Sequence, residues 1–394
     1  MRRRRFWILL ILGWIMSICL ACDSQQAMVS APPERPPAPT LDTPVSPRST
    51  LPPKTQAILD QVGSLVDPPR GEVRLVVISD LNSAYGSTEY DPEVDIGVNL
   101  IPFWQPDLVL CSGDMVAGQK PSLTPEQIRA MWAAFDQHVA APLRSFKIPF
   151  GFTVGNHDAS SATAINGGFL FQQERNLAKE YWETHDPGVQ FVDRFQFPFY
   201  YTFAAKDLFF LVWDGSSNQI PADKLAWVEQ ALASPEAQQA KLRLVIGHLP
   251  LYGVAVGRDE PGEVLSNAEQ LRALLENYRV HTYISGHHHA YYPAHKGQLQ
   301  LLHMGILGSG PRPLIDSDLP PRKALTVIDV NFATPEQTTY TTYDLQTFQL
   351  ITYDQLPRFL AGHNGMVRRR DVEELTAAEQ SACVQKIGNS LCST

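Results

Sequence analysis

Short runs of apolar residues recur through the middle of the chain and predict buried β-strands. Five of them contain mainly Val, Ile, Leu or Phe with no polar alternation, which is typical of strands covered on both faces. These runs are 75–78, 108–110, 150–154, 244–246 and 282–284. Segments 222–233 and 267–278 repeat apolar residues at helical spacing instead. Further strands are expected at 198–213, 325–330 and 339–351. Strands and helices in this arrangement predict an α/β fold.

Each of the five runs ends in a small residue that is followed by a side chain able to bind a metal. The chain reads Ser79-Asp80, Gly113-Asp114, Gly155-Asn156-His157-Asp158, Gly247-His248 and Gly286-His287-His288-His289. Since ligands of open α/β sheets bind outside the carboxyl ends of strands, we expect these side chains to converge. Taken alone, an Asp after a strand is more often a turn or helix-cap residue. Five such ends in one chain favour a shared site for Mn, Fe or Zn.

In this order the motifs resemble those of the calcineurin-like metallophosphoesterases, a superfamily to which the purple acid phosphatases are related. The family pattern is Asp-x-His, Gly-Asp, Gly-Asn-His-Asp/Glu, Gly-His and Gly-His-x-His. The matching motifs here span residues 80 to 289, about half of the chain. The resemblance implies a two-sheet β-sandwich flanked by helices, with a dimetal site at the carboxyl ends of the strands.

The resemblance also implies how two divalent or trivalent metal ions would be held. Asp114 would bridge them, with Asp80 and His289 on one metal and Asn156, His248 and His287 on the other. The first motif departs from the family because Asn82 stands where the family has histidine. A carboxamide oxygen is a weaker and harder ligand than imidazole. The identity of the metals, Mn, Fe or Zn, stays open.

The function implied by the resemblance is hydrolysis of a phosphoester. Two metals lower the pKa of a shared water, so we expect a metal-bound hydroxide to attack phosphorus in line. His157 would be the general acid that protonates the leaving group, and Asp158 its orienting partner. The motifs do not separate a phosphatase from a phosphodiesterase. The alternative, favoured by Asn82, is a catalytically weakened lipoprotein of the same fold that acts as a binding or envelope module.

The N-terminal segment has the pattern of a signal peptide. Four arginines precede residues 6–21, which are apolar except for Gly13 and Ser17 and are too few for an ordinary membrane-spanning helix. The small residues before Cys22 resemble a bacterial lipobox, in which Cys22 would carry lipid. We therefore expect a lipoprotein-type signal peptide at 1–21, a Pro-rich linker at 22–53 and a metallophosphoesterase domain at 54–360. A C-terminal tail would follow at 361–394.

These expectations place the domain outside the cytoplasm, in the periplasm or at the cell surface. The membrane would be reached through an N-terminal lipid or, alternatively, through an uncleaved anchor. Because such a compartment is oxidising, Cys383 and Cys392 are expected to form a disulfide in the tail. The formal charge is −9, from 32 Lys and Arg against 41 Asp and Glu. This balance excludes nucleic acid as the main partner, since binding phosphate backbones needs clustered cations.

Overall fold

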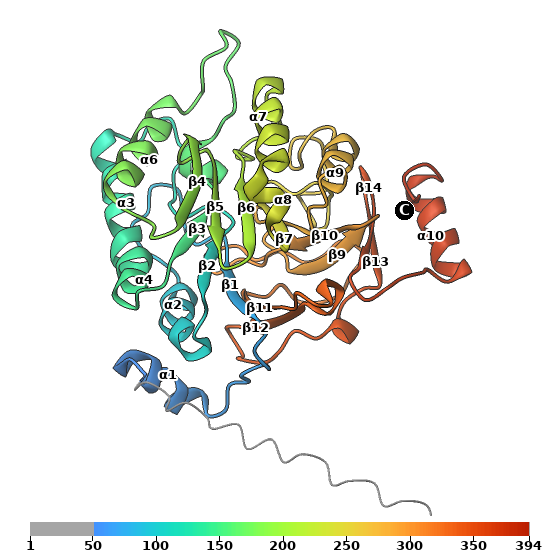
Figure 1. The fold of residues 1–394 in the computed structure, drawn as a ribbon, viewed down its shortest axis with the longest axis horizontal. Helices are drawn as coiled ribbons and strands as arrows, with labels where there is room; N and C mark the ends of the chain where they lie inside the picture. Colours follow the sequence, from blue (N-terminus) through green and yellow to red (C-terminus); the bar gives the residue numbers. More distant parts are fainter. Residues whose placement is uncertain (1–50, 394) are drawn as a thin grey trace, which may run out of the picture. The chain divides into compact units, whose positions relative to one another are not determined.

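Two β-sheets form the centre of residues 51–393, the part of the chain that this computed structural model describes (Figure 1). The five-stranded sheet has the order β12-β11-β1-β2-β3, and the nine-stranded sheet has the order β13-β14-β9-β10-β8-β7-β6-β5-β4. The strands of the first sheet are β1 (Val73–Ile78), β2 (Leu108–Cys111), β3 (Phe150–Phe152), β11 (Ala324–Val330) and β12 (Thr339–Asp344). Those of the second are β4 (Gln190–Gln196), β5 (Tyr200–Ala205), β6 (Leu208–Val212), β7 (Leu242–Ile246), β8 (Thr282–Ser285), β9 (Tyr292–Lys296), β10 (Leu299–His303), β13 (Phe359–Gly362) and β14 (Gly365–Arg369).

Within each sheet, the strands that precede the metal-binding motifs are parallel to one another. β1 pairs with β2 and β2 with β3 in the first sheet, and β6, β7 and β8 pair in succession in the second. All residues of β1, β2, β3, β7 and β8 are buried, as their unbroken apolar runs predict. Parallel strands end at the same edge of a sheet, so each sheet brings its motif residues to one edge.

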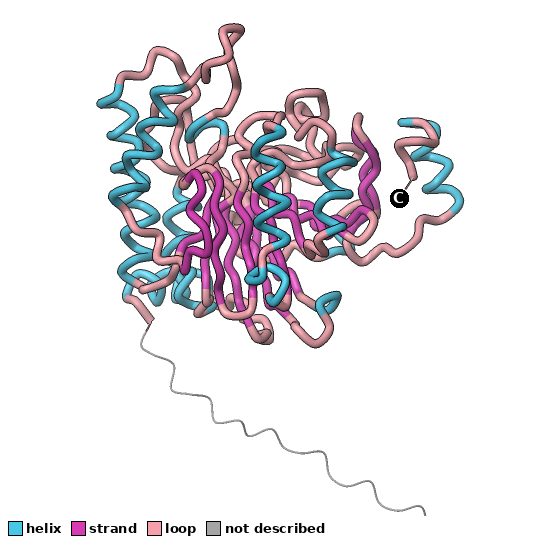
Figure 2. Tube along the Cα trace, turned by 45° about the horizontal axis from the view of Figure 1, so that its top comes forward, coloured by secondary structure: helices cyan, strands magenta, loops and turns pink. Residues whose placement is uncertain are grey.

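Helices cover both sides of these sheets (Figures 1 and 2). The α-helices are α1 (Pro53–Val62), α2 (Pro92–Trp104), α3 (Pro125–Phe135), α4 (Ala141–Ser145), α5 (Asn156–Ala159), α6 (Gln172–Thr184), α7 (Ala222–Ala233), α8 (Pro235–Gln239), α9 (Ala268–Asn277) and α10 (Ala377–Ile387). A π-helical turn, Asp136–Ala140, joins α3 to α4, and 3₁₀ turns lie at Pro335–Gln337 and Tyr353–Gln355. Figure 1 shows α2, α3, α4 and α6 together on one side and α7, α8 and α9 on the other. Among residues 51–393, no helix has the length and apolar character needed to cross a membrane.

The mixed α/β fold with two sheets and flanking helices confirms the predicted fold class. The segments expected to be helical are α7 and α9, and 198–213 contains β5 and β6. The strand expected at 339–351 is shorter in the structure, because β12 ends at Asp344. The Asp344 carboxylate accepts a hydrogen bond from the Gln346 amide at 3.0 Å, and Phe348 has a positive φ of 59°. A turn therefore replaces the end of the strand.

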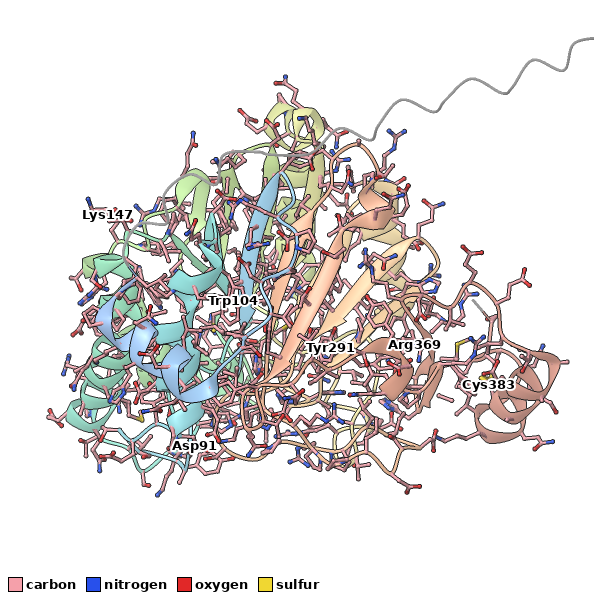
Figure 3. The ribbon with its side chains drawn as sticks, turned by 90° about the horizontal axis from the view of Figure 1, so that it is seen from below. Asp91, Trp104, Lys147, Tyr291, Arg369 and Cys383 are labelled. Atoms are coloured by element: carbon pink, nitrogen blue, oxygen red, sulfur yellow. A yellow bond between two sulfur atoms is a disulfide. The ribbon has the colours of Figure 1, made fainter. Side chains whose placement is uncertain are left out.

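The C-terminal segment adds to the second sheet. β13 and β14 extend that sheet across residue 360, where the sequence analysis places the end of the domain. α10 follows, and Cys383 and Cys392 form a disulfide with a Cα–Cα distance of 5.9 Å (Figure 3). Both cysteines are buried together with Ala361 and Met366 of this sheet edge. The disulfide therefore holds the last residues against the sheet. The predicted signal peptide, Cys22 and the linker up to residue 50 lie outside the described residues.

Candidate metal centre

Both sheets contribute side chains to one polar group at the carboxyl ends of their parallel strands. The oxygen donors follow strands of the five-stranded sheet, namely Asp80 after β1, Asp114 after β2 and Asn156 after β3. The imidazoles follow strands of the nine-stranded sheet, namely His248 after β7 and His287 and His289 after β8. All six residues are at most 9% exposed. The structure therefore brings the scattered motif residues to the junction between the two sheets.

The backbone at these strand ends is unusual and closely packed. Asp80, Asp114, His287 and His289 have φ values of 50°, 55°, 64° and 54°, a region that non-glycine residues rarely adopt and that clusters at functional sites. A Cβ on Gly155 would lie 2.1 Å from Asp114 Oδ1. The glycine before Asn156 is thus needed because the Asp114 carboxylate lies against its backbone.

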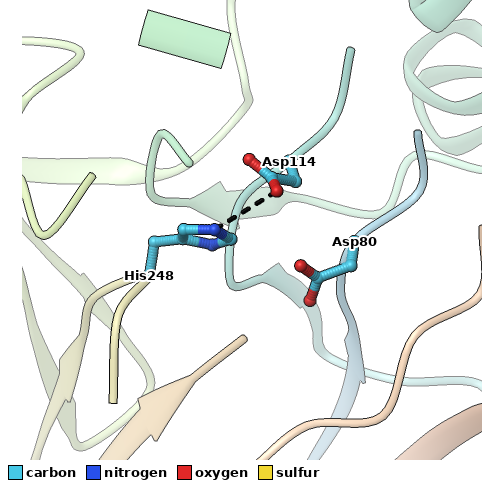
Figure 4. A group of neighbouring side chains, drawn as sticks. All are labelled: Asp80, Asp114 and His248. Atoms are coloured by element: carbon cyan, nitrogen blue, oxygen red, sulfur yellow. Dashed lines mark ion pairs between the residues drawn. The ribbon is translucent and has the colours of Figure 1, made fainter. Parts of the chain in front are cut away.

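Asp114 lies between the other charged groups of the site (Figure 4). One potential ligand atom each from Asp80, Asp114 and His248 lies within 4.8 Å of the others. His248 Nε2 is 3.3 Å from Asp114 Oδ2. Asp114 Oδ1 accepts a hydrogen bond from the His157 amide at 2.8 Å, whereas Oδ2 is buried and accepts none from residues 51–393. This free carboxylate oxygen faces the centre of the group.

The side-chain oxygen of Asn156 lies close to two histidine side chains. His248 Nε2 lies 2.8 Å from Asn156 Oδ1 and His287 Nδ1 lies 2.9 Å from it. The amide nitrogen of Asn156 donates to Gln119 Oε1 at 2.7 Å, which turns the oxygen toward the histidines. These are the three residues expected on one metal. Of the other expected pair, His289 Nε2 lies 3.3 Å from Asp80 Oδ1.

Hydrogen bonds outside the group orient two of the imidazoles. Nδ1 of His248 donates to the Ser112 carbonyl at 2.7 Å, and Nδ1 of His289 donates to the Gly310 carbonyl at 2.9 Å. Both rings therefore present an Nε2 lone pair to the site once they are neutral. Such contacts fix the tautomer and ring orientation of metal-binding histidines.

The electrostatics favour a cation at this position. Burial raises the pKa of Asp114, but the charges of His248 and His157 outweigh burial and bring that pKa below its ordinary value. Burial opposes ionisation of Asp80 too, yet His289 lowers its pKa. Burial lowers the pKa of His248, but Asp114 and Asp80 raise it to about 9. The carboxylates are ionised, and the buried negative charge draws positive charge to itself.

The residues present fit a metal ion. Two buried carboxylates, one carboxamide oxygen and three imidazoles form a donor set suited to Mn, Fe or Zn. Asp114 Oδ2 accepts no hydrogen bond within residues 51–393 and has His248 Nε2 at 3.3 Å; a buried carboxylate oxygen is costly unless positive charge neutralises it, which a metal ion would do when His248 is neutral. Burial lowers the pKa of His287 to about 4, so this ring is neutral, the form that binds metals.

Asn82 lies beside the group without a hydrogen bond to its side chain among residues 51–393. It is 6% exposed, and its backbone amide donates to the Asp114 carbonyl at 3.2 Å. Its own carbonyl accepts from the Ser309 amide at 3.0 Å. The backbone thus places Asn82 next to Asp114, and its carboxamide remains free to provide an oxygen ligand.

The structure corrects the expected role of Asp158. Its carboxylate accepts hydrogen bonds from the backbone amides of Met115, Val116 and Gly155 at 2.7, 2.9 and 2.8 Å. Nδ1 of His157 instead lies 3.2 Å from the Gly118 carbonyl. Asp158 therefore holds the Asp114 loop rather than orienting His157. Two of these amides come from the Asp114 loop and the third from the turn that contains Asp158, so the carboxylate is fully used by the backbone. Burial and the charge of Asp114 raise the pKa of Asp158 to about 7.

Glu263 is a supporting residue that the sequence analysis missed. Its Oε2 accepts hydrogen bonds from His287 Nε2 at 2.7 Å and from Arg258 at 2.5 Å. The bond from His287 lowers the pKa of Glu263 to about 2, with a further contribution from Arg258. His288, to which the sequence analysis assigns no role, is buried. Its Nδ1 accepts a hydrogen bond from the Val254 amide, and its Nε2 donates to the Glu263 carbonyl. No motif marks Glu263, because it lies in a loop without apolar periodicity.

Helix α6 supplies two more supporting residues. Glu174 is buried and accepts hydrogen bonds from the amides of Gln119 and Lys120 at 2.8 and 3.3 Å, which fixes the loop that contacts Asn156. Arg175 donates to the Ala159 carbonyl at 2.6 Å and pairs with Asp214 at 2.8 Å. The only signal in the sequence is a pair of charged residues at the start of an amphipathic helix.

Comparison with known proteins agrees with this geometry. The sequence family described as Calcineurin-like phosphoesterase matches residues 73–291, more than half of the chain. No curated protein sequence matches the chain significantly.

Solved structures of similar fold include a purple acid phosphatase from yellow lupin (Lupinus luteus) seeds, with 15% identity and a TM-score of 0.50 over 72% of this chain. The match spans 54% of the lupin chain, about half its length. A dimetal phosphatase from Danio rerio is 13% identical, with a TM-score of 0.45 over 69% of this chain and 95% of its own. The anchor in the inner membrane complex of Plasmodium is 17% identical, with a TM-score of 0.44 over 72% of this chain and 88% of its own. At these identities the similarity to the lupin structure supports the fold alone.

Proposed function

This chain belongs to the calcineurin-like phosphoesterase family, and from that premise we propose that it is a metal-dependent phosphoester hydrolase and that its own residues carry out the hydrolysis as follows. The family uses a dimetal centre, and this chain has a buried Asp/Asp/His group that fits a metal. The observation that carries the proposal is the free Oδ2 of Asp114, which lies among donors from both sheets.

Six residues would hold two metal ions, with Asp114 shared between them. The others are Asp80 and His289 on one side and Asn156, His248 and His287 on the other, and Asn82 would add an oxygen near Asp80. When bound, such a pair neutralises the phosphoryl oxygens and lowers the pKa of water. Support for a shared Asp114 comes from its carboxylate, in which Oδ1 is held by the His157 amide and Oδ2 remains without a hydrogen bond from residues 51–393.

His157 would act as the general acid. Its Nδ1 donates to the Gly118 carbonyl, so its Nε2 carries the transferable proton in the imidazolium form. Nε2 lies 4.0 Å from Asp114 Oδ2, so a phosphoryl group held by metals on that oxygen would come near this ring. The proton passes from Nε2 to the leaving oxygen, and the Gly118 contact keeps the ring oriented while this happens.

The experiment that tests the hydrolase proposal combines metal analysis with simple esters. The purified chain, reconstituted with Mn, Fe or Zn, should bind about two metal ions and hydrolyse p-nitrophenyl phosphate or its diester, and a chelator should abolish both. Asp114→Asn should lose metal and activity together while remaining folded. A folded parent that binds metal and hydrolyses neither ester would contradict the proposal and favour the binding or envelope module.

We further propose that the domain is tethered outside the cytoplasm through a lipid on Cys22. The support is the order of the N-terminal sequence, with arginines, a short apolar run and small residues before Cys22, followed by a Pro-rich stretch. Cells grown with labelled palmitate should incorporate label into the parent and not into Cys22→Ser. A parent without label would rule out the lipid and leave the uncleaved anchor.

A further inference from the structure

Tyr85 lies beside the proposed general acid and faces solvent. Its ring centroid is 5.0 Å from that of His157, at an interplanar angle of 39°, and Tyr85 is 57% exposed. We propose that Tyr85 determines substrate specificity, because its ring stacks on a planar ring bonded to the leaving oxygen. The inference rests on the proposed hydrolase function and specifies the substrate class as aryl phosphoesters. No family motif contains Tyr85, so the resemblance assigns it no role.

The segment that carries Tyr85 is anchored to the loop after β2. The Gly86 amide donates to the Ala117 carbonyl at 2.6 Å, and Tyr90 Oη donates to the Met115 carbonyl at 2.8 Å. Gly86 has a φ of 82°, a left-handed conformation that favours glycine and lets the chain turn directly after Tyr85. These contacts fix the place of the tyrosine before a substrate arrives.

His157 is anchored to the same loop. The Gly118 amide donates to the His157 carbonyl at 3.0 Å, and the Gly118 carbonyl lies 3.2 Å from His157 Nδ1. Gly118 directly follows Ala117, the residue that holds Gly86. Neighbouring peptide groups of one loop therefore position both rings, which explains how side chains 72 residues apart keep a defined contact.

The Tyr85 side chain has no polar partner within residues 51–393, since its hydroxyl forms no hydrogen bond there. A single exposed aromatic residue is common on protein surfaces, so exposure alone indicates no ligand. The neighbour of this ring is what distinguishes it. The His157 side chain is only 12% exposed, and the small accessible part of its imidazole borders an exposed aromatic ring.

The position of the general acid indicates which part of a substrate would meet Tyr85. The leaving oxygen must come within about 3 Å of His157 Nε2 to receive a proton. A ring bonded to that oxygen begins one bond further on. Aromatic rings attract one another at centroid separations of about 4.5–7 Å, and Tyr85 is in such contact with the imidazole itself. A planar leaving group is thus within reach of Tyr85, whereas an alkyl group offers no face to stack.

The alternative role for Tyr85 is to hold the His157 ring in place. A positioning role would act through the proton transfer and would affect equally all leaving groups that need a proton to the same extent. A stacking role affects only planar leaving groups. Esters that differ in planarity but have leaving groups of similar acidity therefore separate the two roles.

The test compares phenyl phosphate with hexafluoroisopropyl phosphate on the metal-loaded full chain. The two alcohols have similar acidity, but only phenol has a ring. Tyr85→Ala should lower the ratio of kcat/KM for the phenyl ester over the fluoroalkyl ester by about tenfold, the effect of one lost stacking contact. Tyr85→Phe keeps the ring and should keep the parent ratio.

Phe195→Ala provides the matched control. Phe195 is likewise an exposed aromatic residue, and its ring stacks on Trp227. It belongs to β4 at the outer edge of the nine-stranded sheet, three strands from β7, which leads to His248. This variant should keep the parent ratio.

Each ratio comes from a single enzyme sample, so a fraction of unfolded variant cancels. A parent ratio in Tyr85→Ala would overturn the stacking role, and equal falls on both esters with a shifted pH profile of kcat would assign Tyr85 to positioning of His157. A Tyr85→Phe ratio as low as that of Tyr85→Ala would also overturn it, because the hydroxyl and not the ring would be responsible. A parent that hydrolyses neither ester with Mn, Fe or Zn would instead overturn the proposed hydrolase function. The failures are therefore distinguishable.

Discussion

The two flanks of the metal centre are built differently. On the His287 flank, the ring has a continuous set of hydrogen-bonded neighbours. His287 donates to Glu263, and Glu263 also accepts from Arg258. His288 accepts from the Val254 amide, which connects this flank to the core. On the His157 flank, the contacts of the ring within residues 51–393 are fewer: the Gly118 carbonyl at 3.2 Å, Asp114 Oδ2 at 4.0 Å and the exposed Tyr85 ring, 5.0 Å away.

The difference separates two tasks that one centre must perform. A metal ligand has to stand in one place before any substrate arrives, because misplacement by a fraction of an ångström weakens coordination. A general acid has to meet leaving groups of differing shape, so space beside it is useful. On the proposed function, the His287 flank, called the closed flank below, would serve the metals, and the His157 flank, called the open flank below, would serve the substrate. Variants at three positions, His157, Glu263 and His303, probe this division, with a control variant at Glu269.

The largest effect is expected on the open flank, from His157→Ala. Removal of the general acid should lower kcat by about 10²- to 10⁴-fold for ethyl phosphate, whose alkoxide leaves poorly without a proton. The loss should be much smaller for p-nitrophenyl phosphate, whose anion leaves readily. Metal content, measured by elemental analysis, should stay at the parent value because His157 is not a ligand in this assignment. Equal losses on both esters would show that His157 does not act as the acid.

A smaller effect is expected on the closed flank, from Glu263→Ala. Without the carboxylate, the Nε2–H of His287 loses its acceptor, and metal affinity should fall by about 10- to 100-fold, as for other outer-shell contacts. Glu263→Gln keeps an oxygen acceptor without the charge and should recover part of the loss. Calorimetric titration of the metal-free protein with Zn or Mn measures both.

Glu269→Ala provides the matched control for the closed flank. Glu269 pairs with Arg272 and accepts from Tyr252, so its loss removes the same charge from a site without contact to a metal-binding histidine. Its metal affinity should equal that of the parent. If Glu263→Ala binds metal as tightly as Glu269→Ala does, the closed flank has no role in metal binding.

The parts of this centre that could be predicted from sequence are those tied to strand ends. A strand buried on both faces leaves an uninterrupted apolar run, and the residue types that bind metals stand out directly after it, as for Asp80 and His248. The run 108–110 before Asp114 was likewise predicted to be a buried strand, and its three residues are fully buried. Both inferences depend on positions close together in the chain.

What could not be predicted depends on contacts between distant segments. Glu263 reaches His287 across 24 residues and Glu174 reaches the Gln119 loop across 55, and neither contact leaves a periodic signal. Asp158 is adjacent to His157 in sequence, yet its carboxylate turns to backbone amides 42 and 43 residues earlier. Adjacency in the chain was therefore a poor guide to the partner of a side chain in a tight turn.

The smallest expected effect concerns His303, which ends β10 behind His288 on the closed flank, with 6.5 Å between the ring centroids. Both of its ring nitrogens are buried and have no hydrogen-bond partner in the described part of the chain, 51–393, and burial lowers the pKa of His303 to about 3. The unfolded chain takes up a proton near pH 6.5, and the folded chain does so only near pH 3. The contribution of this group to stability is therefore complete above about pH 6.5 and is lost as the pH falls toward 3.

His303→Phe removes both nitrogens while keeping a planar ring. In metal-free protein at pH 7.5, the free energy of unfolding in urea should rise by about 1 kcal/mol, because no unpaired polar atom is buried. Between pH 7.5 and pH 5 the parent should lose about 1–2 kcal/mol more than the variant, since only the parent has a histidine that must stay neutral. Parallel losses in the two proteins would mean that His303 is not held neutral in the fold. The loss of unfolding free energy between pH 7.5 and pH 5 would then have to arise from other groups, such as the metal-binding histidines.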